Sequence, residues 1–237
     1  MKKFLVVGNP IDHSLSPALH NYWIKSNAID AIYEKQKLNE DELEQLILQV
    51  KEKKINGVNV TVPFKKVIIP FLDELSIEAE STQSVNTIYL KDDKVVGHNT
   101  DIIGFETSIE KSKFNVFNKE VLILGAGGVV PSIIFALNKM KVSKIKISNR
   151  TKEKAENLKK LFKNIEIIEW GEVPNFDVII NATSLGLKKN DYINLDFSLI
   201  SKNSLFYDVI YNPGETNFLK AGKKRGNKTL NGRSEER

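Results

Sequence analysis

Lys65 occupies a position in the sequence that suits proton transfer. It lies near the end of INGVNVTVPFKK, residues 55–66. The β-branched residues of this segment predict a strand that stops at Val62, since Pro63 cannot donate to a strand ladder. A helix interrupted by Pro70 is expected to follow, and the positive end of a helix dipole disfavours a nearby cation. Lys65 is therefore a candidate proton carrier, although an exposed surface lysine is the simpler explanation of this stretch taken alone.

A carboxylate that could balance the charge of this lysine is Asp101. It lies in GHNTDIIGF, residues 97–105, next to Asn99 and Thr100. The same NTD sequence stands ahead of a predicted helix over residues 102–112 and is typical of a helix N-cap, so a structural role competes with a catalytic one.

Histidine offers few alternatives for acid–base chemistry. The chain has three histidines: His13, His20 and His98. His20 is expected on a helix over residues 17–27 that buries Leu19, Tyr22 and Trp23, where a structural role is as reasonable as a functional one.

Two hydroxyls in DHSLSPALH, residues 12–20, could hold a small carboxylate. Ser16 precedes Pro17 and makes a good helix N-cap with proline at the first helical position. Ser14, on the same loop, has no evident capping role. Two hydroxyls at a helix start are also suited to a carboxylate ligand.

A glycine turn between a strand and a helix indicates a dinucleotide site. Gly125, Gly127 and Gly128 follow an apolar strand predicted over residues 119–124 and precede a long apolar helix. Glycines permit the tight turn and a close backbone approach, and the helix N-terminus faces the pyrophosphate. Val130 replaces the third glycine of the usual pattern, so the match is imperfect.

The end of the next predicted strand favours NADP over NAD. The sequence there is SNRTKEK, residues 148–154, with no carboxylate before Glu153. An acidic side chain at this point would accept a hydrogen bond from the ribose 2′-hydroxyl of NAD, whereas the planar guanidinium of Arg150 suits a 2′-phosphate. An arginine that only solvates the strand end is the competing explanation.

Composition excludes several classes of protein. The chain has 237 residues, of which 41% are hydrophobic and 27% charged, and we expect a globular protein without a membrane span or signal peptide. Cysteine is absent, which excludes disulfides, thiolate zinc sites and a cysteine nucleophile. We expect a cytoplasmic protein without a metal site.

The net charge of +5 raises nucleic acid as a partner. The lysines instead alternate with glutamate, as in KEKK at 51–54 and TKEKAENLKK at 151–160, which is typical of solvated helix faces. We therefore expect a small-molecule substrate, no nucleic acid and no membrane partner, in a monomer or a homodimer.

The order of predicted elements indicates an α/β fold with two domains. Strands and helices alternate in the first part, which includes a hairpin that turns at Asp92 and Asp93. The alternation starts again near residue 119 and predicts a parallel sheet with right-handed crossovers. We expect an N-terminal α/β substrate domain over residues 1–101 and a Rossmann-type NADP-binding domain over residues 102–218.

Taken together, the motifs resemble the shikimate dehydrogenase family. They occur in the family's order from Phe4 to about Gly232: SLSP at 14–17, NVTVPFK at 59–65, SVNT at 84–87, GHNTDIIGF at 97–105, GAGG at 125–128, NRT with Lys154, NATSLGL at 181–187 and YDVIYNP at 207–213. The resemblance implies an oxidoreductase that acts on a CH–OH group. It would catalyse the reversible, NADP-dependent reduction of 3-dehydroshikimate to shikimate in aromatic amino-acid biosynthesis, in a cleft between the two domains.

The resemblance also implies a role for each matching residue. Six residues would bind the substrate: Ser14, Ser16, Thr61, Asn86, Asp101 and Tyr211. The two serines would bind its carboxylate, while Thr61, Asn86 and Asp101 would hold its ring oxygens. Lys65 and Asp101 would form the catalytic pair that transfers a proton at the reacting C3 oxygen. Ten residues would bind NADP: Gly125, Ala126, Gly127, Gly128, Asn149, Arg150, Thr151, Lys154, Val209 and Gly232.

Two features depart from the family pattern. QSVNT stands where members more often have Gly-Ala before VNT, and after TLNG at 229–232 the chain reads RSEER. Members usually continue into an apolar helix that carries a substrate-contacting glutamine. We expect residues 219–237 to form a truncated C-terminal segment that returns toward the first domain. If this is the whole native chain, we expect weakened substrate binding and an exposed apolar patch on the first domain.

Other functions stay open at this point. A catalytically impaired relative would bind NADP without turnover, and a quinate/shikimate dehydrogenase or an NAD-using relative would share the same motifs. A basic nucleic-acid binder would shift DNA or RNA in a salt-dependent manner.

Overall fold

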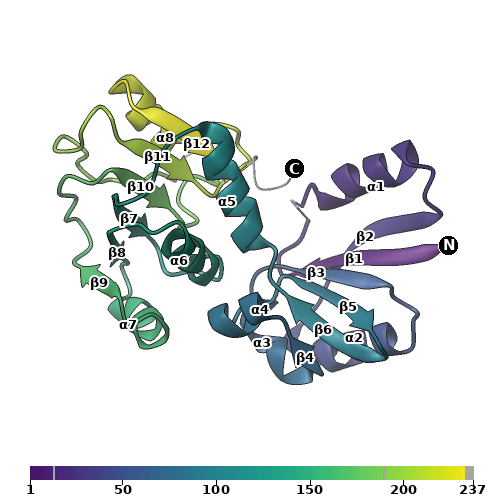
Figure 1. Cartoon of the computed structure of the whole chain (residues 1–237). Helices are drawn as coiled ribbons and strands as arrows, with labels where there is room; N and C mark the ends of the chain where they lie inside the picture. Colours follow the sequence, from purple (N-terminus) through teal and green to yellow (C-terminus); the bar gives the residue numbers. More distant parts are fainter. Residues whose placement is uncertain (13, 189–190, 233–237) are drawn as a thin grey trace. The chain divides into compact units, whose positions relative to one another are not determined.

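A computed structural model describes residues 1–12, 14–188 and 191–232 (Figure 1). The chain divides into two compact units, Met1–Thr100 and Asp101–Arg237. Each unit has its own six-stranded sheet, which agrees with the predicted two-domain α/β fold. Among the described residues, no helix combines the length and the apolar character needed to cross a membrane.

The sheet of the first unit is mixed. In spatial order its strands are β2 (Ala31–Lys37), β1 (Lys2–Gly8), β3 (Gly57–Val60), β5 (Thr87–Lys91), β6 (Lys94–His98) and β4 (Glu74–Leu75). The first three run parallel to one another, while β5 is antiparallel to both of its neighbours. The predicted hairpin is confirmed: Asp92 and Asp93 both have positive φ angles, of 50° and 58°, as a tight two-residue turn between antiparallel strands requires.

The helices of the first unit are short. They are α1 (Ser16–Ser26), a 3-10 turn at Glu40–Glu42, α2 (Leu43–Lys51), α3 (Phe64–Val67), a second 3-10 turn at Ile69–Phe71 and α4 (Ile77–Thr82). Because alternate residues of a strand point to opposite faces, Leu5 and Val7 pack with Leu46 on one face of the sheet. Val6 and Tyr33 belong to a smaller cluster, together with Ile24 of α1.

Helix α1 differs from its prediction in what it buries. No residue of α1 is buried, and Tyr22 and Trp23 are 68% and 38% exposed. The helix covers a small cluster with only one side, so the aromatic residues predicted to be buried lie at the surface. Unit 1 therefore exposes large apolar side chains at this helix.

The segment after β3 also corrects the prediction. The strand ends at Val60 rather than Val62, and the predicted long helix is replaced by α3 and a 3-10 turn. Pro70 cannot donate to a continuing helix, and Leu72 is already extended, with φ −95° and ψ 146°. Leu75 then pairs with Gly97 in the sheet as part of β4.

The sheet of the second unit is parallel throughout. In spatial order its strands are β9 (Ile165–Ile168), β8 (Lys144–Ser148), β7 (Glu120–Leu124), β10 (Val178–Asn181), β11 (Leu205–Asp208) and β12 (Lys228–Asn231). Numbered along the unit, this order is 3-2-1-4-5-6, the strand order of a dinucleotide-binding Rossmann sheet. The chain adds strands outward from β7 in one direction and then from β10 in the other, so the topological switch point lies between β7 and β10.

In the described part of this unit, four helices accompany the sheet: α5 (Asp101–Ser112), α6 (Val130–Lys139), α7 (Lys152–Leu161) and α8 (Asn217–Lys224). The central strands are buried on both faces, as in other parallel sheets. Ile123 and Ile180 pack in one cluster with Phe105 of α5. Leu122 and Ile179 pack in the other, with Phe218 of α8.

The C-terminal part corrects the expected domain limits. Residues 219–237 were expected to form a separate segment, but residues 219–232 complete α8 and add β12 to the parallel sheet. Pairing with β11 explains this placement, since Leu205 aligns with Lys228 and Asp208 with Asn231. The unit boundary lies between Thr100 and Asp101. Residues 233–237, which were expected to return toward the first domain, lie outside the described residues.

Candidate active site

One edge of the first sheet collects the predicted substrate residues of that unit. Thr61 follows β3 and donates its backbone N–H to Val7 of β1 at 2.9 Å. Asn86 precedes the antiparallel strand β5, and its N–H donates to the carbonyl of His98, at the end of β6, at 3.0 Å. The carboxyl ends of β1, β3 and β6 and the amino end of β5 therefore lie at the same edge.

Ser14 and Ser16 follow β1 at this edge, but their capping roles differ from the prediction. The N-cap of α1 is Leu15, whose side chain makes no capping hydrogen bond. The hydroxyl of Ser14 accepts the N–H of Ser16 at 3.3 Å. The hydroxyl that accepts a backbone N–H at the start of this helix is therefore that of Ser14, whereas the prediction gave this role to Ser16. Both serines are half-buried.

Lys65 is the second residue of α3 and is half-buried, whereas Lys66 is exposed. Its carbonyl accepts the N–H of Val85 at 2.8 Å, which ties the lysine segment to the residue next to Asn86. Helix α3 has four residues, so its dipole is too short to carry the electrostatic argument that singled out Lys65. The placement at the sheet edge is the stronger argument for this lysine.

Asn86 holds the segment that leads to Asp101. Its Oδ1 accepts the N–H of Thr100 at 2.9 Å and the hydroxyl of Thr87 at 2.9 Å. Asn99 is 2% exposed and donates its Nδ2 to the carbonyl of Ser84 at 2.9 Å. Asp101 begins α5, where the positive end of a helix favours a carboxylate. The pairing of Lys65 with Asp101 joins residues of two units and stays a prediction.

A polar chain across this sheet was missed by the sequence analysis. The hydroxyl of Tyr33 on β2 donates to Oδ1 of Asn59 on β3 at 2.6 Å, and Asn59 Nδ2 donates to Thr87 Oγ1 at 3.2 Å. His20 stacks on Tyr33 with ring centroids 4.2 Å apart, and burial lowers the pKa of this histidine. The available signal was a polar residue, Asn59, inside the apolar strand GVNV.

The carboxyl edge of the second sheet collects the predicted cofactor residues. Gly125, Asn149, Val209 and Gly232 directly follow β7, β8, β11 and β12. Because parallel strands end at the same edge, these residues share it, and open α/β sheets bind their ligands at this edge beside the switch point. Tyr211 lies two residues beyond Val209 and is half-buried.

Two glycines are required by close backbone approach. Gly125 has φ +111°, and a Cβ atom there would lie 2.7 Å from the carbonyl oxygen of Ala182. A Cβ atom on Gly232 would collide with the carbonyl oxygen of Val209. The structure thus brings Val209 and Gly232 together. Gly127 and Gly128 are exposed in the turn that leads from β7 to α6, and Ala126 is half-buried there.

The turn after β8 presents two cations. Arg150 and Lys154 are exposed, as is Thr151, and Asn149 Nδ2 fixes the turn by donating to the carbonyl of Thr151 at 2.7 Å. The glycines of the turn after β7 and these two cations together fit a dinucleotide that carries an additional 2′-phosphate.

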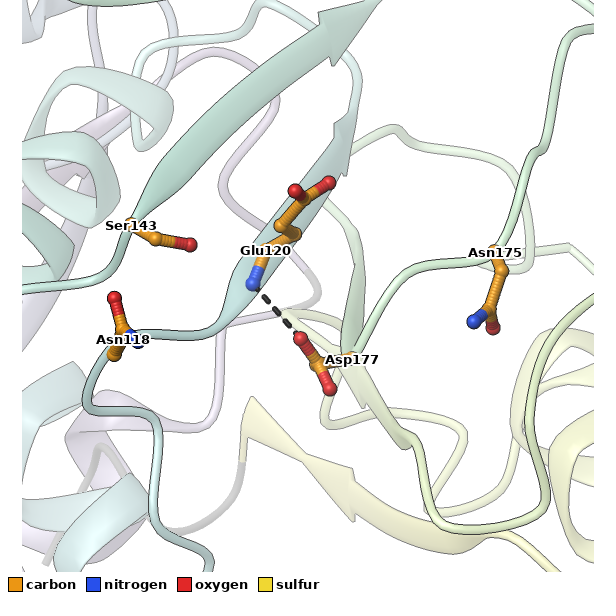
Figure 2. A pocket seen from close by; sticks show the side chains of 5 residues that line it. All are labelled: Asn118, Glu120, Ser143, Asn175 and Asp177. Carbon is orange, nitrogen blue, oxygen red and sulfur yellow. Dashed lines mark hydrogen bonds between the residues drawn. The ribbon is translucent and has the colours of Figure 1, made fainter.

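A polar hollow lies at the other edge of the second sheet (Figure 2). Its lining residues are Asn118, Glu120, Ser143, Asn175 and Asp177. They lie at the amino ends of the strands, opposite the edge of Gly125, and include none of the predicted site residues. The carboxylate of Asp177 accepts the N–H of Glu120 at 2.9 Å and pairs with Lys119 at 3.1 Å. These bonds stabilise the strand ends, so we assign no ligand to this hollow.

Known protein families match both units. The shikimate dehydrogenase substrate binding domain matches residues 6–88, and the shikimate / quinate 5-dehydrogenase domain matches residues 108–189. The shikimate dehydrogenase (NADP(+)) of Pelagibacter ubique is 63% identical over 232 residues, which cover 98% of this chain and 88% of that protein.

Solved structures agree with these matches. The crystal structure of shikimate dehydrogenase from Aquifex aeolicus has a TM-score of 0.89 and 38% identity, and the match covers 99% of this chain and 88% of that one. Shikimate 5-dehydrogenase from Thermus thermophilus, solved in complex with NADP(H) and shikimate, has a TM-score of 0.90 and 29% identity over the same shares of both chains. The chain belongs to the shikimate dehydrogenase family.

Proposed function

We propose that this protein is an NADP-dependent shikimate dehydrogenase that reversibly reduces 3-dehydroshikimate to shikimate. The observation that carries this proposal is the 63% identity to the Pelagibacter enzyme across 98% of the chain. It is supported by the two sheet edges, which separately gather the side chains that this reaction needs. We assign substrate binding mainly to Met1–Thr100 and cofactor binding to the unit that begins at Asp101.

The second unit would hold NADP along its carboxyl edge. The glycines of the turn after β7 leave room for the pyrophosphate, and Asn149, Arg150, Thr151 and Lys154 would surround the 2′-phosphate. Val209 and Gly232, whose backbones lie in close contact, would flank the nicotinamide. When bound, NADPH supplies the hydride, and the chain itself must position the substrate and move one proton.

The first unit would orient the substrate. Ser14 and Ser16 would bind the carboxylate, and Thr61 and Asn86 would hold ring oxygens. Asp101, which would also hold a ring oxygen, and Tyr211, which would also bind the substrate, belong to the second unit. Lys65 would donate a proton to the C3 oxygen as the ketone is reduced and would recover it in the reverse direction. Asp101 would accept a hydrogen bond from the lysine and balance its charge.

Quinate differs from shikimate in its saturated ring and one further hydroxyl. The described residues at the edge of the first sheet include no group that would exclude quinate. The structure from Thermus named for its complex with NADP(H) and shikimate favours shikimate as the substrate to test first.

A pair of adjacent lysines tests the mechanism. Lys65→Ala is expected to lower kcat by at least about 100-fold, the range that a positioned acid–base group supplies, while the chain still binds NADPH. Lys66→Ala is the matched control, since Lys66 is exposed one residue away and is expected to leave kcat near that of the parent chain.

The measurements are steady-state rates of shikimate oxidation and a fluorescence titration with NADPH. Full activity in Lys65→Ala would rule out the proposed proton carrier. Loss of NADPH binding in the same variant would instead indicate a damaged fold.

A further inference from the structure

A fully buried carboxylate lies at the carboxyl edge of the second sheet. Asp208 is the last residue of β11 and is 0% exposed. Its Oδ1 accepts Nδ2 of Asn181 at 3.0 Å and the N–H of Ile210 at 3.0 Å. Its Oδ2 accepts the hydroxyl of Thr216 at 2.5 Å. Three donors from separate segments therefore converge on one side chain.

Each donor anchors a different segment. Asn181 ends β10 and also holds the loop after it, since its Nδ2 donates to the carbonyl of Leu185 at 3.1 Å and its Oδ1 accepts the hydroxyl of Thr183 at 2.7 Å. Thr216 is the N-cap of α8, and its hydroxyl accepts the N–H of Leu219 at 3.3 Å. Asp208 thus joins the loop after β10, the loop after β11 and the start of α8.

Stability alone does not account for a carboxylate at this point. Burial raises the pKa of Asp208 to about 6, although the bonds from Thr216, Ile210 and Asn181 oppose this rise. Among the described residues, no charged group contributes to that pKa. On the described parts of the surrounding segments, six ionisable side chains are exposed: Lys188, Glu215, Lys220, Lys223, Lys224 and Lys228. Tyr207 is buried on β11, and Tyr211 and Arg225 are half-buried. Arg225 donates to the carbonyls of Ser198 and Ile200. A buried unpaired charge is costly, so a neutral side chain of the same shape would satisfy packing at least as well.

Asp208 directly precedes Val209, one of the two residues proposed to contact the nicotinamide. Val209 is the next residue, and its N–H donates to the carbonyl of Asn181 at 3.0 Å. The carbonyl of Val209 is also the group against which Gly232 packs without a side chain. A small displacement at Asp208 would therefore move both residues that flank the nicotinamide, and misplacement by about 1 Å is enough to impair catalysis.

We propose that Asp208 is a positioning residue for the nicotinamide half of the cofactor, acting through Asn181 and Thr216 on the loops after β10 and β11. This inference rests on the proposed function. It assigns no contact between Asp208 and the cofactor.

Asp208→Asn tests the inference because it keeps the size of the side chain and removes an acceptor and the charge. The variant is expected to raise KM for NADP+ roughly tenfold, the effect of losing one hydrogen bond to a charged group, with KM for shikimate changed by less than about twofold. Asp196→Asn is the matched control. Asp196 is an exposed aspartate of the same unit that also accepts hydrogen bonds, from Ser198, and its loss is expected to leave both constants unchanged.

A pH profile separates positioning from general structural damage. In the parent chain, NADP+ affinity is expected to weaken as the pH falls through about 6, where Asp208 takes up a proton. The cofactor's own 2′-phosphate titrates in the same way in every variant. The difference between the parent and Asp208→Asn therefore isolates Asp208, and it is expected to shrink below pH 6.

Calorimetric titration with NADP+ beside the kinetic assay distinguishes the outcomes. An unchanged KM for NADP+ in Asp208→Asn, with an active parent, would overturn the inference and leave the proposed function intact. A parent chain that does not bind NADP+ would remove both. Should circular dichroism show that Asp208→Asn is unfolded, Thr216→Val replaces it. An unchanged KM there would also overturn the inference, while Thr216→Ser, which keeps the hydroxyl, is expected to match the parent.

Discussion

We propose that Arg150 determines the preference for NADP over NAD. The exposed guanidinium at the end of β8 is expected to bind the 2′-phosphate that distinguishes NADP from NAD. Arg150→Ala is therefore expected to raise KM for NADP+ by roughly 10-fold to 100-fold, the range of one charge-assisted interaction, and to leave KM for NAD+ nearly unchanged. Steady-state kinetics with both cofactors would measure this.

Lys159→Ala is a suitable control for that experiment. Lys159 is exposed in the last turn of α7, whereas Arg150 precedes the helix. Equal losses for NADP+ and NAD+ in Arg150→Ala would contradict the assigned contact.

Asp208 also makes a prediction about stability. The pKa of this carboxyl is 3.8 in an unfolded chain and about 6 in the folded one, so the folded state binds the proton more tightly. The corresponding stability is fully present below pH 3.8 and is lost as the pH rises through about 6. Each tenfold change in proton binding is worth about 1.4 kcal/mol, so the total change approaches about 3 kcal/mol.

Urea unfolding of the parent chain and Asp208→Asn from pH 4 to pH 8 would measure this term. The free energy of unfolding of the parent is expected to fall relative to the variant as the pH rises. A constant difference across that range would show that Asp208 does not titrate as proposed.

At the scale of elements, the positions of the site residues follow from where strands end. The sequence motifs place Gly125 directly after a strand, and the structure confirms this strand end. The strand predicted to stop at Val62 ends at Val60 instead, so Thr61 follows β3 rather than lying within it. Which strands neighbour one another depends on pairing between distant segments, and a single sequence does not contain that information. The sharing of one edge by Val209 and Gly232 therefore required the structure.

The elements missed in the sequence are short or polar. Helix α8 reads NFLKAGKK, and three of its residues are buried: Phe218, Leu219 and Gly222. Strand β12 reads KTLN and has no buried residue, so it carries no clear alternation. Its partner β11 stabilises it. Asn181 and Asp208 belong to motifs quoted from the sequence. Their hydrogen bond joins β10 to β11, and it could not be predicted because the sequence does not show that these strands are neighbours.

The chain of hydrogen bonds across the first sheet can be tested at Tyr33. Tyr33→Phe removes the donor to Asn59, and we expect a loss of about 1 kcal/mol in the free energy of unfolding. Because Asn59 also bonds to Thr87 and to the carbonyl of Asn86, KM for shikimate is expected to rise severalfold while KM for NADP+ stays constant.

Tyr22→Phe is the matched control. Tyr22 lies on α1, the helix that precedes β2 and Tyr33 in the sequence, and its side chain is 68% exposed. Unfolding curves and steady-state kinetics would report both effects. If Tyr33→Phe raised only KM for NADP+, the role given to the hydrogen bonds of Tyr33 and Asn59 would be contradicted.

At the scale of the whole molecule, we propose that each of the two units supplies part of the groups for one reaction. The proposed cofactor residues lie at the carboxyl edge of a parallel sheet, and the proposed substrate residues of the first unit lie at the edge formed by the carboxyl ends of β1, β3 and β6 and the amino end of β5. The family match extends over both units, with 98% of the chain aligned to the Pelagibacter enzyme. We therefore expect that the chain, with both units present, oxidises shikimate with NADP+.

The most direct test is the initial rate of NADPH formation by the complete chain with shikimate and NADP+, compared with quinate and with NAD+ under the same conditions. We expect turnover with shikimate and NADP+, with kcat/KM above about 10⁴ M⁻¹s⁻¹ as for typical enzymes, and at least about tenfold lower values for the other combinations. A folded chain that binds NADP+ but forms no NADPH from shikimate would contradict the account.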